Sequence, residues 1–244
     1  FQDEQIEKEF AQAVEEHRVE EVYWVGGEPL MYEQHWRYMQ RIIELGDGPK
    51  VYARYNTNLS RVSYKGIDLY RDILNGIRDW QICASLDGTD RIGEYIRTGL
   101  DIELWEKNLH TYLSLTNSPV TFMITFNILS VTTFKELLKK ILEWRARYNC
   151  YNKSKWPQMV RFDTPYLKEP LQYDMNILPK KEFMPYMHEA LAFMEANVDN
   201  NSGDKFTELE YEKFRRVVSY METTSYPDEK LLKRCEKLSL ACLF

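Results

Sequence analysis

The stretch Trp24-Val25-Gly26-Gly27-Glu28-Pro29-Leu30 decides how the rest of the chain is interpreted. An apolar run stops here at two glycines, a carboxylate and a proline. Glycine lets a backbone come close to a ligand and adopt dihedral angles closed to other residues, whereas proline ends strand pairing and can open a helix. We therefore expect a strand to end at this junction and its turn to form the floor of a ligand site.

Strand and helix patterns alternate on both sides of this junction. Ile6, Phe10 and Val14 recur at every fourth position, which predicts an amphipathic helix over residues 3–17. Five strands are predicted in total, over 22–25, 51–55, 81–86, 120–128 and 159–162. The helices predicted after the first four of them cover 36–46, 67–77, 102–115 and 134–144. This alternation predicts right-handed βαβ units and a mainly parallel sheet.

The pattern changes in the last third of the chain. Three helical stretches follow, over 183–196, 206–220 and 229–240, with no convincing strand between them. We therefore expect an α/β core over residues 1–170 and a helical extension over residues 171–244.

Composition limits the classes of partner. The chain has 244 residues, of which 44% are hydrophobic, enough for one large globular domain or one and a half. A net charge of −6 argues against nucleic acid or an anionic membrane as a partner, because both select for a basic face. No segment has the pattern of a membrane span or a signal peptide, so a cytoplasmic location is expected.

The four cysteines are scattered, and no two of them form a C-x-x-C pair. So few thiols in so long a chain do not predict a disulfide framework. Cys83 falls inside a predicted strand, where we expect a small buried hydrophobic residue.

Polar or glycine-rich loops follow four of the predicted strands. They are Gly26–Pro29, Asn56–Asn58, Ser85–Gly88 and the position of Asn127. Each alone is a common turn sequence, but ligands of parallel α/β sheets gather at the carboxyl ends of the strands. Together the loops offer carbonyls and a carboxylate for an ammonium group, amides and a hydroxyl for a carboxylate or ribose, and Arg97 for an anion.

The order of these loops resembles the radical S-adenosylmethionine superfamily. The matching elements are Gly26-Gly27-Glu28-Pro29, then Asn56-Thr57-Asn58, then Ser85-Leu86-Asp87-Gly88. The sequence around Tyr55–Asn58 and Tyr95–Arg97 is similar to that of the SPASM/twitch branch. The resemblance covers about residues 3–170 and implies a partial (βα)6 barrel, with the α-helical extension after it.

The resemblance also implies which residues bind S-adenosylmethionine. Backbone carbonyls at Gly26, Gly27 and Glu28 would hold its methionyl ammonium group, and Ser85, Asp87 and Arg97 would meet its carboxylate and ribose. The full implied cofactor-binding set is Gly26, Gly27, Glu28, Pro29, Asn56, Asn58, Ser85, Asp87, Arg97 and Asn127. No catalytic residue is assigned.

The sequence departs from the family at the cluster. Relatives hold a [4Fe-4S] cluster through a C-x-x-x-C-x-x-C loop between the first strand and the first helix, and this chain, which starts at Phe1, has no such motif. We expect the first strand and the cluster loop to precede Phe1; the alternative is that the cluster has been lost. Cys235 and Cys242 are too few for the usual four-ligand auxiliary cluster, so ordinary buried cysteines are favoured there.

The sequence therefore predicts a radical S-adenosylmethionine enzyme that modifies an unknown substrate. A peptide or protein is slightly preferred over a small molecule, and an electron donor for the cluster is a further expected partner. Two alternatives remain open. One is a cluster-free scaffold of the same fold that binds a ligand or partner, and the other is an ordinary partial-barrel enzyme whose loops hold a different nucleotide.

Overall fold

The computed structural model describes residues 2–116, 118–149 and 158–224. Five strands form a parallel sheet in the order β1-β2-β5-β6-β7, with helices between them. The predicted α/β class is confirmed. The chain divides into two compact units, one made of residues 1–85 and 103–120 and the other of residues 86–102 and those from 121 onward.

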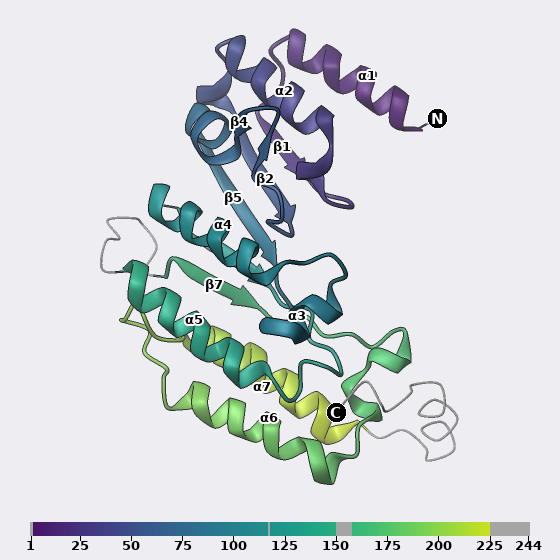
Figure 1. The fold of residues 1–244 in the computed structure, drawn as a ribbon, viewed down its shortest axis with the longest axis vertical. Helices are drawn as coiled ribbons and strands as arrows, with labels where there is room; N and C mark the ends of the chain where they lie inside the picture. The colour runs from purple at the N-terminus through teal and green to yellow at the C-terminus, as the bar shows by residue number, and fades with distance from the viewer. Residues whose placement is uncertain (1, 117, 150–157, 225–244) are drawn as a thin grey trace. The chain divides into compact units, whose positions relative to one another are not determined.

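The first unit carries three strands of the sheet and three long helices (Figure 1). Its main elements are α1 (Gln2–Glu15), β1 (Glu21–Trp24), α2 (Glu33–Glu44), β2 (Tyr52–Thr57), β5 (Asp79–Ser85) and α4 (Ile102–Leu115). Its short elements are η1 (Pro29–Met31), η2 (Gly48–Lys50), β3 (Ser63–Tyr64), β4 (Ile67–Asp68), η3 (Leu69–Ile73) and η4 (Leu74–Gly76).

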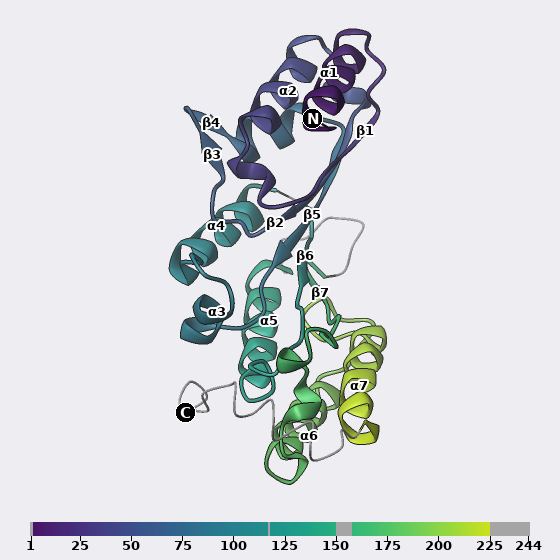
Figure 2. The same ribbon diagram turned by 90° about the vertical axis from the view of Figure 1, so that its right-hand side faces the viewer.

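The helices of this unit bury one face of the sheet. Ala53, Tyr55 and Thr57 alternate along β2 as its buried positions. Tyr55 contacts His35 of α2, and Trp80 of β5 donates a hydrogen bond to Tyr112 of α4. Figure 2, which views the strands nearly edge-on, shows α2 and α4 on the same side of β1, β2 and β5. This side is the apolar core of the unit.

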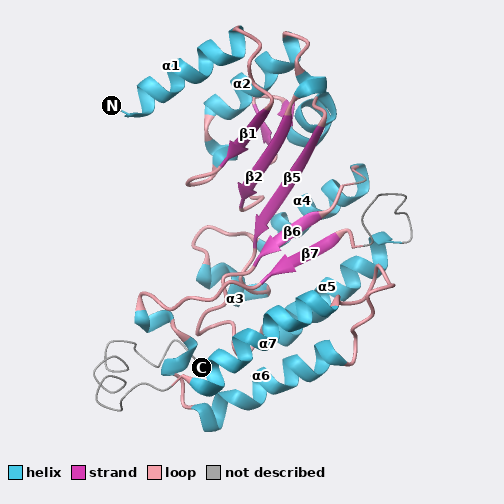
Figure 3. Cartoon of the chain, turned by 180° about the vertical axis from the view of Figure 1, so that it is seen from behind, coloured by secondary structure: helices cyan, strands magenta, loops and turns pink. Residues whose placement is uncertain are grey.

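The other face of the same three strands carries no helix of this unit, as Figure 3 shows by placing the strands in front of α2. The parallel register shows which side chains lie on this face: Tyr23 is aligned with Arg54, and Asn56 with Cys83. Because side chains alternate along a strand, Ser85 lies on this face too. Cys83 is only partly buried, so the expectation of a buried cysteine is corrected; the buried positions of β5 are its neighbours Ile82 and Ala84.

A hairpin replaces part of the helix predicted over 67–77. Lys65 and Gly66 both have positive φ, 48° and 90°, and join β3 to β4. Positive φ at both central residues is the requirement of the tight turn that matches strand twist. The chain then forms the π-helical turn η3, whose first amide groups are capped by the Asp68 carboxylate. The helix predicted over 67–77 is therefore present only as the short turns η3 and η4, which begin after the hairpin.

The second unit combines two strands with a layer of helices. Its elements are α3 (Asp90–Ile96), β6 (Val120–Met123), α5 (Phe134–Asn149), β7 (Val160–Asp163), η5 (Leu171–Tyr173), η6 (Met175–Ile177), α6 (Lys180–Glu195) and α7 (Glu208–Thr223). Helices α5, α6 and α7 lie side by side in Figure 1. The strand predicted to run to Ile128 is regular only as far as Met123, although Phe126 still forms a parallel bridge with Tyr166. Beyond Met123, Thr125 donates its amide to Asp87, and the Asn127 side chain closes a turn on Leu129.

A buried arginine joins the helices of the second unit to its sheet. Arg145 of α5 is fully buried and donates to the carbonyl of Val160, at 2.7 Å, and to the carboxylate of Glu210, at 2.6 Å. Glu210 also completes the capping box that begins α7 at Thr207. One carboxylate therefore fixes both the start of α7 and its attachment to α5.

Two of the three predicted C-terminal helices correspond to α6 and α7. The third, over 229–240, lies outside the described residues, as do Cys150, Cys235 and Cys242. The domain boundary near residue 170 stays a prediction. Within the described part of the chain, no helix has both the length and the apolar character needed to cross a membrane.

Candidate functional site

The loop after β1 has the geometry of a glycine turn. Gly26 and Gly27 both have positive φ, 92° and 46°, which few other residues adopt without strain. Both are exposed, and a side chain built at Gly26 would meet no atom within 4 Å. None of the described residues donates a hydrogen bond to the carbonyl of Gly26 or Gly27. These carbonyls are therefore open to a donor from a ligand.

Gly27 is more restricted than Gly26. A side-chain carbon at Gly27 would lie 2.9 Å from the hydroxyl of Tyr32, closer than real carbon contacts allow. A large side chain at this position therefore displaces Tyr32 as well as filling space in the loop.

The carboxylate of Glu28 accepts hydrogen bonds from other residues of the protein. One oxygen accepts from the hydroxyl of Thr57, at 2.7 Å, and from the amide of Leu30, at 3.2 Å. The other oxygen accepts from the amide of Asn58, at 2.6 Å. Glu28 therefore ties the loop after β1 to the end of β2, and Pro29 starts the short helix η1 directly after it. The backbone carbonyl of Glu28, expected to hold the ammonium group, already accepts the amide of Met31 at 3.0 Å. An ammonium group at this loop would therefore be left with the carbonyls of Gly26 and Gly27.

The remaining candidates of the first unit come from β2 and β5. Asn56 lies on the helix-free face and its side-chain amide has no hydrogen-bond partner among the described residues. Asn58 follows β2, and its side-chain oxygen accepts the amide of Ser60 in a local turn. Ser85 ends β5 on the same face as Asn56. The free amide at Asn56 makes it the best placed of the three to contact a ligand.

The other three candidates, Asp87, Arg97 and Asn127, lie in the second unit and contact protein groups there, although the Nε of Arg97 has no partner in hydrogen-bond geometry among the described residues. Asp87 is buried, forms an ion pair of 2.8 Å with Arg97, and accepts the amide of Thr125 at 2.7 Å. Burial raises the pKa of the Asp87 carboxyl, although Arg97 and the Thr125 amide oppose the change. Asn127 donates to the carbonyl of Thr125 and accepts from Leu129, which holds the turn. These contacts show structural roles, and the expected cofactor contacts of the three residues stay predictions.

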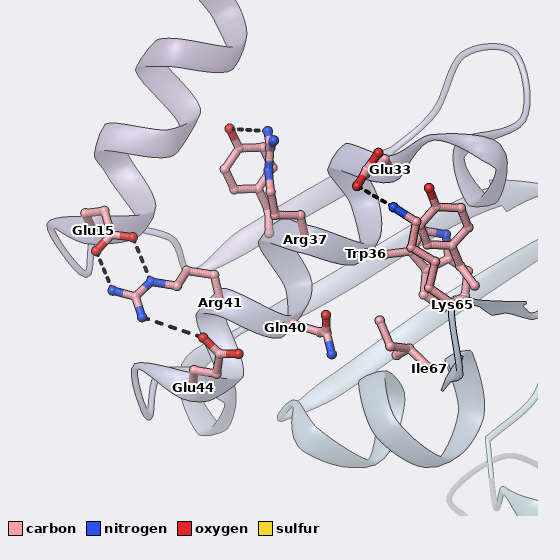
Figure 4. Close-up of a pocket in the computed structure, with 11 residues that line it drawn as sticks. Glu15, Glu33, Trp36, Arg37, Gln40, Arg41, Glu44, Lys65 and Ile67 are labelled. Carbon is pink, nitrogen blue, oxygen red and sulfur yellow. Dashed lines mark hydrogen bonds and ion pairs between the residues drawn. The ribbon is translucent and has the colours of Figure 1, made fainter.

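A separate cavity of about 410 Å³ lies beside α2 and includes none of the candidate residues. Figure 4 shows Gln40 and Ile67 along it, between two groups of paired charges. Arg41 forms two hydrogen bonds with Glu15, at 2.7 and 2.8 Å, and Lys65 pairs with Glu33 at 3.0 Å. Because these charged groups already have partners, the strand-end loops remain the stronger candidate site.

No metal site is formed by the residues that the structure describes: no three of their His, Cys, Asp and Glu side chains come together as ligands. The described residues therefore do not supply the ligands of an iron–sulfur cluster. Among the described residues, the groups open to a ligand are the carbonyls of Gly26 and Gly27, the space at Gly26 and the side-chain amide of Asn56.

Sequence reasoning missed one residue of this site. Thr57 lies inside the candidate loop Asn56–Asn58, and its hydroxyl makes the contact to Glu28. Comparison with protein-family models, with curated proteins and with solved structures finds no match for the chain.

Proposed function

We propose that the chain is the core of a radical S-adenosylmethionine enzyme and that the loop Gly26–Glu28 holds the methionyl ammonium group of that cofactor. The observation that carries the proposal is the hydrogen bonding of this loop. Its carboxylate is saturated by three donors, while the carbonyls of its two glycines accept none from the described residues. A site of this kind selects a ligand that donates hydrogen bonds.

The helix-free face of the first unit supports the same proposal. Parallel sheets normally have both faces covered, so a face with partly exposed polar side chains requires an explanation. In a partial (βα)6 barrel that face would be the interior. Tyr23, Arg54 and Asn56 would then line the space next to the cofactor, with Arg54 lying 4.8 Å from the centre of the Tyr23 ring.

The chemistry implied by the family resides in the bound groups. When bound, a [4Fe-4S] cluster would supply the one-electron reductive cleavage of S-adenosylmethionine, with the electron coming from a donor protein or reductant. Cluster ligands would have to come from sequence outside the described residues. This chain's own contribution is to bind the cofactor at the strand ends and to present a substrate, for which a peptide or protein is preferred.

The enzymatic proposal is tested with the full-length gene product. It is reconstituted with iron and sulfide without oxygen, then assayed for 5′-deoxyadenosine formed from S-adenosylmethionine. We expect a bound cluster and deoxyadenosine. Absence of both contradicts the proposal and favours the cluster-free scaffold.

The site is tested by cofactor affinity in matched variants. Asn56→Leu replaces the free amide at the strand end, whereas Gln81→Leu makes the same change on the same face beside Arg54. Losing one hydrogen bond to a charged ligand costs about 1.5–3 kcal/mol, so Asn56→Leu should weaken binding of S-adenosylmethionine by roughly tenfold or more. Equal affinities in the two variants would remove Asn56 from the site.

A further inference from the structure

A strained backbone position lies directly behind the Gly26–Glu28 loop. Leu59, two residues after the end of β2, has φ of 52° and a fully buried side chain. This left-handed conformation is uncommon for residues other than glycine, asparagine and aspartate, and leucine has no polar side chain to stabilise it locally. Such a conformation persists only where surrounding contacts impose it.

Both backbone polar groups of Leu59 are fixed by side chains. Its amide donates to the hydroxyl oxygen of Thr57, at 3.0 Å. Its carbonyl accepts from the side-chain amide of Asn108, at 2.7 Å. Asn108 lies on α4 and is buried, and its own backbone carbonyl accepts the hydroxyl of Tyr70 at 3.2 Å. Helix α4 thus holds the chain in the conformation that Leu59 adopts.

The contact continues from Leu59 to the cofactor loop. A hydroxyl has one proton, so a Thr57 oxygen that accepts from Leu59 directs its proton to the carboxylate of Glu28. Glu28 in turn holds the amide of Leu30, which fixes the exit of the glycine turn. An uninterrupted series of hydrogen bonds therefore runs from Asn108 through Leu59 and Thr57 to Glu28.

We propose that Asn108 is a positioning residue for the Gly26–Glu28 loop, acting through the conformation of Leu59 and the hydroxyl of Thr57. The consequence for a ligand rests on the proposed function, but the mechanical link between helix α4 and the loop does not. No hydrogen bond joins Asn108 directly to the loop in the part of the chain that the structure describes, so we expect its effect to pass through the two intermediate residues.

The link is tested by hydrogen exchange of the amides of Leu30 and Met31, in the full chain. Asn108→Leu removes the donor at nearly constant volume, and Thr57→Val removes the hydroxyl. Each should raise the exchange rate at these amides by about tenfold, because a buried polar group is left without its partner. Thr57→Ser keeps the hydroxyl and should retain the exchange rate of the parent protein.

The double variant Asn108→Leu with Thr57→Val distinguishes an effect passed along the hydrogen-bonded series from a general loss of stability. Residues that act as one series are not additive, so Asn108→Leu with Thr57→Val should exchange no faster than the faster single variant. Leu113→Ala, a buried change on the same helix away from Leu59, controls for lost stability. If Asn108→Leu affects Leu30 no more than Leu113→Ala does, or if the two single effects multiply, the proposal is wrong.

Cofactor affinity separates this inference from the proposed function. Asn108→Leu should weaken binding of S-adenosylmethionine by about tenfold, while Leu113→Ala leaves it unchanged. Failure of the parent protein to bind S-adenosylmethionine would overturn the proposed function alone, since exchange at Leu30 still decides the role of Asn108. Binding by the parent that is equally tight in Asn108→Leu would contradict the positioning role.

Discussion

The buried ion pair between Arg145 and Glu210 leads to the sharpest stability prediction. Replacing Arg145 with methionine keeps most of its apolar volume but leaves the carboxylate of Glu210, itself only 7% exposed, without its cation. The carbonyls of Val160 and Lys205 lose their donor in the same step. Breaking a buried pair from one side typically costs about 3–5 kcal/mol, and we expect a value near 4 kcal/mol here.

Helix α7, which carries Glu210, also provides a control variant. Arg215 and Glu212 form an ion pair on α7 that is exposed to solvent, with 57% of the arginine side chain accessible. Pairs of this kind contribute about 0–1 kcal/mol, so Arg215→Met should change the free energy of unfolding very little. Both variants remove a guanidinium group paired with a glutamate, but the Arg215 pair is exposed and lies within one helix, whereas Arg145 also donates to two backbone carbonyls.

Urea unfolding followed by tryptophan fluorescence measures the difference. Trp144 is buried beside Arg145 in sequence and reports on the second unit. A loss of about 4 kcal/mol corresponds to a fall in melting temperature of about 10 °C for a domain of this size. If Arg145→Met is no less stable than Arg215→Met, the pair does not hold the second unit together.

Two further predictions concern the first unit. Gly27→Ala should distort the loop because its added carbon meets the hydroxyl of Tyr32, and adding Tyr32→Phe should partly restore the loop. The exchange rate of the Leu30 amide measures the single and the double variant. No recovery in the double variant would refute the steric cause. Burial lowers the pKa of His35 to about 3, so its neutral form is retained on folding while the unfolded chain gains a proton below pH 6.5. Stability from this depressed pKa is present above pH 6.5 and is lost as pH falls towards 3, by about 2–3 kcal/mol between pH 6.5 and 4.5. His35→Phe should remove that part of the pH dependence of unfolding, and an unchanged dependence would refute the assignment.

Periodic burial made much of the fold predictable. The pattern of Trp36, Met39 and Ile43 predicts helix α2, whose buried face in the structure contains Trp36, Met39 and Ile42, and the alternation along β2 marks its buried side. Where two side-chain contacts redirect the backbone, the pattern was insufficient. The pattern through Val120 predicts a strand to Ile128, but the regular strand ends at Met123, and the side chains of Asp87 and Asn127 bind backbone amides just beyond it.

The candidate site shows the same division. A glycine pair followed by an acid and a proline was enough to locate the loop, because only a few residue types tolerate its backbone angles. The use of the acid was not predictable. Glu28 was expected beside the cofactor, and the structure shows its carboxylate bound to Thr57, Asn58 and Leu30.

The sequence by itself determined the α/β class, the order of the five sheet strands and the longer helices, and the glycine turn after β1, because local spacing and backbone preference encode these features. Only the tertiary structure decided that Asn108 reaches Leu59 across 49 positions of the chain and that Arg145 reaches Glu210 across 65. Hydrogen bonds between such distant residues depend on how helices and strands pack. The type of a residue and its neighbours in sequence do not identify its distant partner. For the loop at Gly26, the local sequence fixed the turn, and packing decided which of its groups remain available to a ligand.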